Sequence, residues 1–127
     1  MEIHFKSAHT KDVADEVTPG VTSLAQRKLV ALKKYLGKTD GITQVYVELG
    51  KVTEAHQNGN VWRAQINLDS QGKRYHADAT GGNIRVAIDV AVREIEAELR
   101  KAKQMNKDVI KKGGTAFKSF IRGFGTR

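Results

Sequence analysis

Four segments of the chain alternate apolar and polar residues, which is the period-two pattern of strands with one buried face. The first lies at the N-terminus, where Ile3 and Phe5 alternate with polar residues, and it ends near Ala8. Three more follow one another in the middle of the chain, at residues 44–49, 62–68 and 74–79. Turn-forming residues separate these three segments, at Asn58-Gly59 and at Asp69-Ser70-Gln71-Gly72, so we expect an antiparallel meander.

Two other segments place apolar residues three and four positions apart, as amphipathic helices do. The first begins at Thr18 and Pro19, a typical N-cap and first helical residue, and ends at Gly37. The second begins after Asn83, and its periodicity stops after Asp108. The apolar stripes are Val21, Ala25, Leu29, Leu32 and Leu36 in the first helix, and Ile84, Ile88, Ala91, Val92, Ile95, Leu99 and Ala102 in the second.

The resulting order is strand, helix, three strands, helix, which predicts an α+β fold. Because a helix connects the first strand to the meander, we expect that strand to pair in parallel with its neighbour. Both helices then cover one face of a four-stranded mixed sheet, giving a two-layer sandwich. In this arrangement Phe5, Trp62 and Tyr75 face the core, whereas Tyr46 faces solvent. We assign residues 1–107 to the folded domain and residues 108–127 to a basic, flexible tail.

Composition restricts the classes of function that the chain can have. It has 127 residues and no cysteine, which excludes disulfides, a thiolate zinc site and a cysteine nucleophile. No apolar run approaches the roughly 18 residues of a membrane-spanning helix, and the N-terminus lacks the apolar block of a signal peptide. We therefore expect one cytoplasmic domain that has no membrane partner.

The net charge of +8 is distributed unevenly. Residues 1–100 carry 14 Lys and Arg against 13 Asp and Glu, whereas residues 101–127 carry eight Lys and Arg against Asp108 alone. A polyphosphate partner favours such asymmetry, because each neutralised phosphate releases counterions. If the helices pack side by side, their basic residues form one patch that reads the backbone and shape of RNA. A tail that serves only solubility is the alternative.

Candidate catalytic and metal-binding residues do not form a recognisable site. The four histidines, His4, His9, His56 and His76, lack helical ligand spacing. The carboxylates Glu94, Glu96 and Glu98 lie three or four residues from arginines, which favours solvated ion pairs. Gly81-Gly82-Asn83 before a helix is a weak phosphate-binding signal, and a plain turn is the preferred interpretation. We expect no enzyme activity, cofactor, metal or small-molecule substrate.

Three segments resemble one known family. Val17-Thr18-Pro19 and Arg27-Lys28-Leu29-Val30-Ala31-Leu32-Lys33-Lys34-Tyr35 are similar to the first helix of bacterial ribosome hibernation promoting factors, also called ribosome-associated inhibitors or ribosomal subunit interface proteins. Tyr75-His76-Ala77-Asp78-Ala79 resembles the last strand of that family, and residues 87–92 and 99–103 resemble its second helix. With the order of elements, the resemblance covers about residues 1–107. Asn83 and Arg85 depart from the family pattern, which often has an acidic residue and a tyrosine there.

The resemblance implies a short form of a factor that sits between the head and body of the small ribosomal subunit. There it would block the positions of messenger and transfer RNA and silence idle ribosomes during stress. The implied partners are the small subunit and its ribosomal RNA, and we expect a monomer away from the ribosome. By similarity, the residues in contact with ribosomal RNA are Lys33, Lys34, Arg100, Lys101 and Lys103. The basic stripe of the second helix and the tail add Arg93, Lys107, Lys111 and Lys112 to the expected RNA-binding residues.

Two other interpretations remain open. A double-stranded-RNA-binding module has a helix, three strands and a helix, which would match residues 18–107. The extra first strand argues against it, as does the position of the basic residues at the end of the second helix rather than at its start. A protein-interaction adaptor would instead use the solvent-facing side of the sheet, with the tail as a solubility device.

Overall fold

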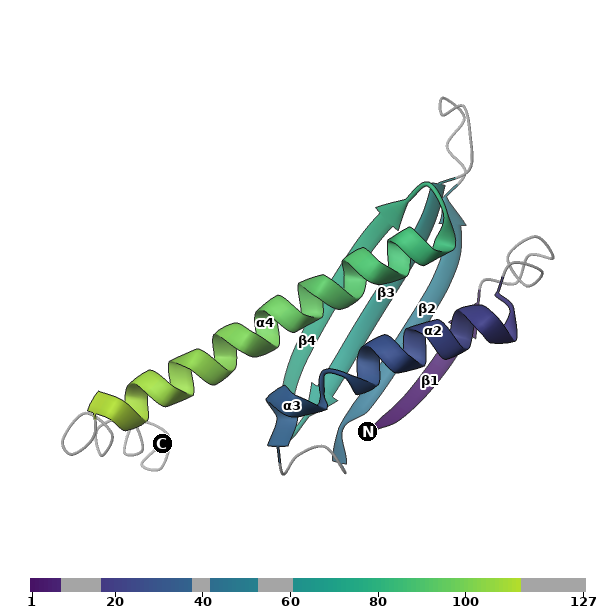
Figure 1. Cartoon of the computed structure of the whole chain (residues 1–127). Coiled ribbons are helices and arrows are strands. Elements are labelled where there is room, and N and C mark those ends of the chain that lie inside the picture. Colours follow the sequence, from purple (N-terminus) through teal and green to yellow (C-terminus); the bar gives the residue numbers. More distant parts are fainter. Residues whose placement is uncertain (8–16, 38–41, 53–60, 113–127) are drawn as a thin grey trace.

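The computed structural model describes residues 1–7, 17–37, 42–52 and 61–112 of the chain. The elements in chain order are β1 (Glu2–Ser7), α2 (Pro19–Val30), α3 (Lys33–Leu36), β2 (Gln44–Val52), β3 (Val61–Ser70), β4 (Lys73–Gly81) and α4 (Ile84–Lys112). They form one four-stranded sheet with the helices on one of its faces (Figure 1). The predicted α+β two-layer architecture is therefore confirmed.

The strands lie in the order β1-β2-β3-β4. β1 pairs with β2 in parallel, with Phe5 opposite Val47, and the connection between them contains α2 and α3. The pairs β2–β3 and β3–β4 are antiparallel, so that Val47, Ile66 and Ala77 are neighbours on the buried face. The predicted parallel first strand and antiparallel meander are both confirmed, while the predicted turn at Asn58-Gly59 lies outside the described residues.

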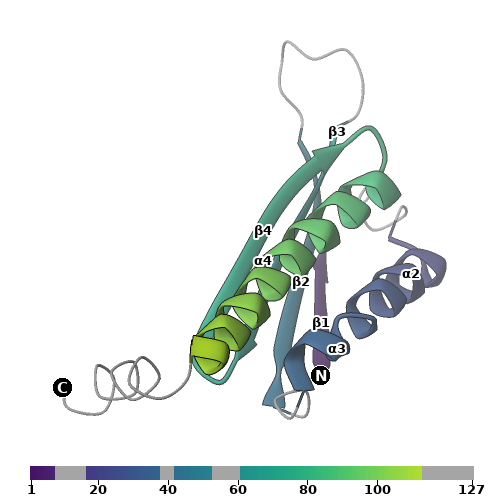
Figure 2. The same cartoon turned by 60° about the vertical axis from the view of Figure 1, so that its left-hand side comes forward.

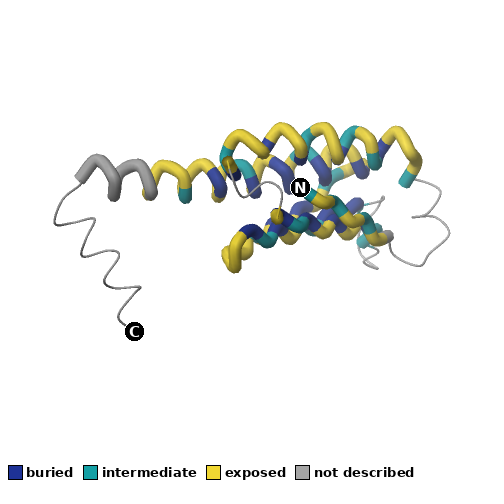
Figure 3. The backbone as a smooth tube through the Cα atoms, turned by 90° about the horizontal axis from the view of Figure 1, so that it is seen from below, coloured by how far each residue is buried: buried dark blue, intermediate teal, exposed yellow. Residues whose placement is uncertain are grey.

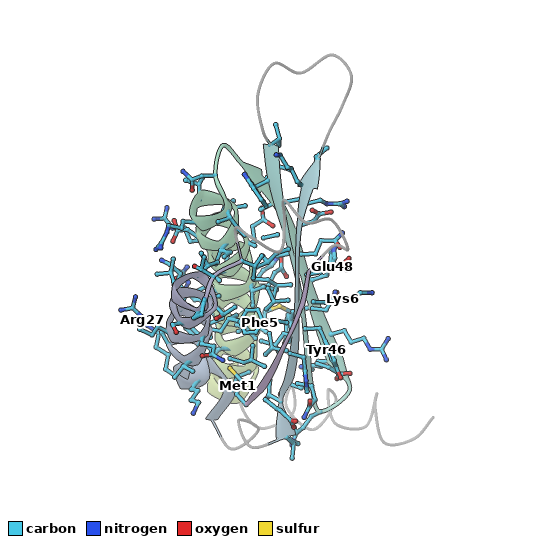
Figure 4. All side chains as sticks on the ribbon, turned by 90° about the vertical axis from the view of Figure 1, so that its right-hand side faces the viewer. Met1, Phe5, Lys6, Arg27, Tyr46 and Glu48 are labelled. Carbon is cyan, nitrogen blue, oxygen red and sulfur yellow. The ribbon has the colours of Figure 1, made fainter. Side chains whose placement is uncertain are left out.

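Apolar side chains of the sheet and the helices meet in one core. Trp62 on β3 is only 6% exposed, and Phe5 and Tyr75 pack, partly buried, against the same core. Tyr46 is 51% exposed. Figure 4 shows Phe5 on the helix side of the sheet and Tyr46 on the opposite side. The period-two pattern therefore predicted the correct face for all four aromatic residues.

A two-residue turn joins β3 to β4. Gln71 and Gly72 both have positive φ angles, 50° and 77°, as a type I′ hairpin turn requires. The strand pairing extends further into the predicted turn than the sequence indicated, because Asp69 and Ser70 belong to β3. Ser70 is buried there, and its hydroxyl accepts a hydrogen bond of 3.0 Å from the hydroxyl of Thr43. The partner for this buried hydroxyl explains why a polar residue can end the strand.

The first helix is interrupted, although the apolar spacing predicted one helix as far as Leu36. The amide of Leu32 donates to the carbonyl of Leu29 at 2.9 Å, and that of Tyr35 donates to Leu32 at 3.0 Å. These three-residue steps are the tighter 3₁₀ pattern, and they separate α3 from α2. Leu32 and Leu36 both remain buried, and Gly37 ends α3 with a φ of 56°. Apolar steps of three and four fit either geometry, so the spacing did not reveal the break.

The second helix is longer than its apolar periodicity. α4 has 29 residues and continues to Lys112, past Asp108. A helix of this length spans about 44 Å, and its C-terminal part extends beyond the sheet (Figure 1). Figure 3 shows buried residues only in the part of α4 that covers the sheet, and the described side chains after Ala102 are exposed. The predicted division at residues 107 and 108 thus falls within a helix, and the chain after Lys112 lies outside the described residues.

Candidate nucleic-acid interface

The two layers of the molecule differ in charge. Helices α2, α3 and α4 together contain twelve Lys and Arg residues against five Asp and Glu, whereas the four strands contain five against four. The helices pack side by side on the sheet (Figure 2), as predicted. Their charge therefore gathers on the helical layer. Arg27, for example, points away from the sheet (Figure 4).

An ion-pair group joins α2 to α4. Nζ of Lys28 donates to Oδ1 of Asp89 at 2.9 Å, and Nη2 of Arg93 lies 3.1 Å from the other oxygen of the same carboxylate. The hydrogen bond from Lys28 lowers the pKa of Asp89, although burial opposes that shift. The side chain of Arg93 is 76% exposed, and a guanidinium has five N–H donors. Arg93 can therefore contact a phosphate while it keeps its ion pair.

A second link joins α3 to α4 near the basic end of α4. Nζ of Lys103 donates to the main-chain carbonyl of Lys34 at 3.1 Å. The ammonium groups of Lys34 and Lys103 lie 5.1 Å and 6.0 Å from the centre of the Tyr35 ring, within the range of cation–π attraction. This arrangement brings two predicted RNA-binding residues together, although they lie on different helices.

One stripe of α4 carries three of the predicted residues, Arg93, Arg100 and Lys103. Asp89, Arg93, Glu96, Arg100 and Lys103 recur at steps of four and three residues and therefore share one side of the helix. Nη2 of Arg100 lies 3.4 Å from a carboxylate oxygen of Glu96 within this stripe. The stripe thus has mixed sign at its start and is basic at its end.

The remaining predicted residues lie away from this stripe or in the last turns of α4. Lys101 follows Arg100 and is therefore turned about 100° around the helix axis, off the stripe. Lys33 is exposed on α3. Three others lie in the last turns of α4, where the side chains are outside the described part of the structure: Lys107, Lys111 and Lys112. The structure thus brings together Lys34, Arg93, Arg100 and Lys103, with Lys28 as a contributor that the candidate set did not include.

The open face of the sheet has a different character. The guanidinium of Arg63 holds the carboxylate of Asp78 with two hydrogen bonds, one of them 2.8 Å long, and lowers the pKa of Asp78 to about 2. The rings of His4 and Tyr46 are stacked, with centroids 5.0 Å apart. Because cross-strand partners neutralise its charges, this face offers a polyanion much less attraction than the helical layer does.

The turn before α4 is explained by packing and capping. A Cβ atom on Gly81 would lie 2.8 Å from the amide nitrogen of Ala87, so the first turn of α4 requires glycine there. The carboxamide oxygen of Asn83 accepts a hydrogen bond of 2.9 Å from the amide of Val86. Asn83 thus caps the N-terminus of α4, and its oxygen already occupies one of the amides that a phosphate would use.

The described parts of the chain contain neither a cluster of metal ligands nor a membrane-spanning helix. There, no group of three or more His, Cys, Asp or Glu residues could hold a metal ion. Among the described helices, none is long and apolar enough to cross a membrane.

Comparison with known families adds to this geometry. The family model described as sigma 54 modulation protein / S30EA ribosomal protein matches residues 8–107. The chain belongs to this family. The match covers the interrupted first helix, the meander and the stripe of α4 that carries Arg93, Arg100 and Lys103, and it confirms the resemblance found in the sequence motifs.

Two solved structures share the fold. The N-terminal domain of Protein Y from Thermus thermophilus is 24% identical, with a TM-score of 0.60, and the match covers 80% of this chain and 98% of that one. A ribosomal subunit interface protein from Coxiella burnetii is 14% identical, with a TM-score of 0.61, covering 82% and 99% respectively. We found no match among curated proteins.

Proposed function

We propose that the protein binds the small ribosomal subunit in the channel used by messenger and transfer RNA and inhibits translation by idle ribosomes. Membership of the S30EA family supports a ribosomal partner. The solved relatives named as Protein Y and as a ribosomal subunit interface protein have the same fold. The partner would be ribosomal RNA, met by the helical layer, and the site of action would be the cytoplasm.

The contact between Lys103 and Lys34 is the observation that carries this proposal. It unites the basic end of α4 with α3 in one exposed cluster, close to a half-buried aromatic ring. Cationic side chains held on a rigid scaffold bind RNA through backbone phosphates and shape, which suits a structured ribosomal RNA. The open sheet face, with its charges paired, would face away from the strongest phosphate contacts.

Inhibition would follow from occupancy rather than from catalysis. A protein that blocks the channel acts on one ribosome at a time, so inhibition of translation should saturate at one protein per ribosome without consumption of a nucleotide. Titration of the protein into a translation reaction of known ribosome concentration measures this ratio. Inactivation of many ribosomes by one molecule would contradict the proposal.

Sedimentation distinguishes the proposed partner from the alternatives. The protein should co-sediment with 30S subunits and compete there with transfer RNA. A double-stranded-RNA-binding module would bind a plain RNA duplex as tightly as the subunit, and a protein-interaction adaptor would bind neither RNA. The parallel strand β1 also separates this fold from the helix, three strands and helix of the duplex-binding module.

A further inference from the structure

A cavity of about 170 Å³ lies where α3, α4 and the turn between β3 and β4 meet. Leu36, Leu99 and Ala102 give it an apolar lining, and Tyr35 and Tyr75 add two aromatic rings. Both tyrosines are partly buried and pack against the core, so their rings are held in place before any ligand arrives. The cavity is open to solvent. The elements that line it, α3, α4 and the β3–β4 hairpin, come together at the end of the sheet past which α4 extends (Figure 1).

The size of the cavity restricts its occupant. An apolar protein cavity of about 150 Å³ accommodates one benzene molecule, whereas sites for drug-sized ligands begin at roughly 300 Å³. A volume of about 170 Å³ therefore suits a single aromatic ring. The mixture of apolar, aromatic and hydrogen-bonding groups suits a heterocyclic ring better than a hydrocarbon, because Lys73 and Gln71 also line the cavity.

The charges around the cavity favour an anionic ligand. Lys73 belongs to the lining, and the ammonium groups of Lys34 and Lys103 lie over the ring of Tyr35. Burial raises the pKa of Tyr75, the other tyrosine of the cavity, and the nearby carboxylate of Glu98 raises it further. Three ammonium groups thus outnumber this carboxylate, so a ring that carries phosphates is the complementary ligand.

We propose that this cavity receives one unstacked pyrimidine base of the bound RNA, whose adjacent phosphates contact Lys73, Lys34 and Lys103. Proteins commonly recognise single-stranded RNA by taking splayed-out bases onto aromatic side chains. A purine would leave its second ring outside a cavity of this size. The inference rests on the proposed function, because it requires RNA to pass over α3 and the end of α4.

Mononucleotides test the cavity without a ribosome. Uridine and cytidine monophosphates, titrated into the labelled full-length protein, should shift the NMR signals of Tyr35, Tyr75 and the Leu99 methyl groups. Adenosine monophosphate should shift them less at equal concentration, and inorganic phosphate should leave Leu99 unchanged. Equal shifts with inorganic phosphate would show that the site binds only an anion and would overturn the inference of a bound base. Equal shifts with adenosine monophosphate would overturn the choice of a pyrimidine. No shift with any nucleotide would overturn the inference.

A substitution that fills the cavity tests its role on the ribosome. Ala102→Leu adds bulk to the lining without changing charge or helix propensity, and Ala97→Leu is a matched control on the exposed side of the same helix. Ala102→Leu should abolish the pyrimidine shifts and weaken binding to 30S subunits by roughly 5- to 150-fold, the range for loss of one base stacked on an aromatic side chain. Ala97→Leu should behave as the wild type.

A second variant keeps the test valid if Ala102→Leu lowers the melting temperature. Lys73→Ala removes an exposed ammonium group, so it should leave the fold intact and still weaken the shifts caused by uridine monophosphate. If both variants bind mononucleotides and 30S subunits like the wild type, the inference is wrong while the proposed function stands. If the wild type itself fails to co-sediment with 30S subunits, the proposed function is wrong, whatever the mononucleotides show.

Discussion

Nζ of Lys103 lies 3.1 Å from the main-chain oxygen of Lys34, which is 69 positions earlier in the chain. Lys103→Ala should therefore remove a cation and also release α3 from the end of α4. We expect weaker binding to 30S subunits and a salt dependence shallower by roughly 0.7 to 0.9 log units per log unit of salt. Lys101→Ala removes the same charge from another side of the helix, and it should have the smaller effect on affinity. Binding measured at three salt concentrations compares the two variants, and equal losses would contradict a specific role for the Lys103 contact.

The carboxylate of Asp89 offsets part of the positive charge of Lys28 and Arg93, because both cations pair with it. Asp89→Asn should strengthen binding to 30S subunits and make it more sensitive to salt. The matched control is Asp78→Asn, which makes the same change in charge on the open face of the sheet and should leave affinity unchanged. An equal gain in both variants would show that net charge, rather than the helical layer, determines binding.

The same aspartate should give stability a defined pH dependence. Its pKa is lower in the folded protein than the ordinary value of about 3.9, so its ion pairs stabilise the fold above that value. The contribution is lost as the pH falls through the folded-state pKa. For a partly exposed pair we expect about 0.2 to 1 kcal/mol at neutral pH. The difference in unfolding free energy between wild type and Asp89→Asn should therefore shrink as the pH falls below about 3.9 and disappear below the folded-state pKa. A difference that persists at lower pH would contradict this origin.

Trp62 tests the register of the sheet. Its side chain is 6% exposed beneath the helices, so Trp62→Ala should lower the free energy of unfolding by about 3 to 5 kcal/mol. That loss is a large part of the roughly 5 to 15 kcal/mol that a domain of ordinary stability has. Tyr46→Ala is the control on the opposite face, where 51% exposure predicts little change. Denaturant unfolding measures both variants, and similar losses would show that the two faces had been exchanged.

Much of the fold was predictable because alternation and helical spacing report burial directly. Trp62 and Tyr46 fell on the correct faces for that reason, and the parallel pairing of β1 followed from its helical connection. The break before α3 was not predictable, since Leu32 and Leu36 remain buried in either geometry. The end of α4 was missed because it extends past the sheet, where no apolar stripe is required.

The sequence predicted where the charges of the candidate site lie, but it did not predict which of its residues contact one another. Spacing along α4 indicated that Arg93, Arg100 and Lys103 share one side of the helix. The bond from Lys103 to a carbonyl of α3 has no signature in the sequence, because any residue supplies a carbonyl. The link from Lys28 to Asp89 depends likewise on how two distant helices pack.

Two truncations separate the contribution of the chain end from that of the helical layer. Removal of all residues after Lys107 deletes five cations together with Asp108 and shortens α4, whereas removal of those after Lys112 deletes three cations and keeps the helix. If each cation meets a phosphate, the salt dependence should become shallower by roughly 3 to 4 and by about 2 log units per log unit of salt, respectively. Both proteins should still compete with transfer RNA, only more weakly.

Charge reversal within the helical layer tests the contribution of that layer, as the truncations test that of the chain end. Replacing Arg100, Lys101 and Lys103 with Glu should abolish specific competition with transfer RNA and leave a weak, nonspecific attraction to RNA. Competition at two or three salt concentrations measures both sets of variants. We expect the helical layer to select the binding site and the chain end to add affinity. If truncation abolished competition with transfer RNA and charge reversal did not, the two roles would be the other way round.

The parallel pairing of β1 with β2 has a consequence for how the chain folds. Glu2 pairs opposite Gln44, 42 positions away, whereas only two residues separate β3 from β4. Closing the longer loop costs more chain entropy, and contacts between distant residues slow folding. We therefore expect the β3–β4 hairpin to form early and β1 to join last, so substitutions in β1 should accelerate unfolding with little effect on the folding rate. The first of the four strands to be synthesised would then be the last to find its partner, and its edge would stay unpaired until β2 has left the ribosome that makes it.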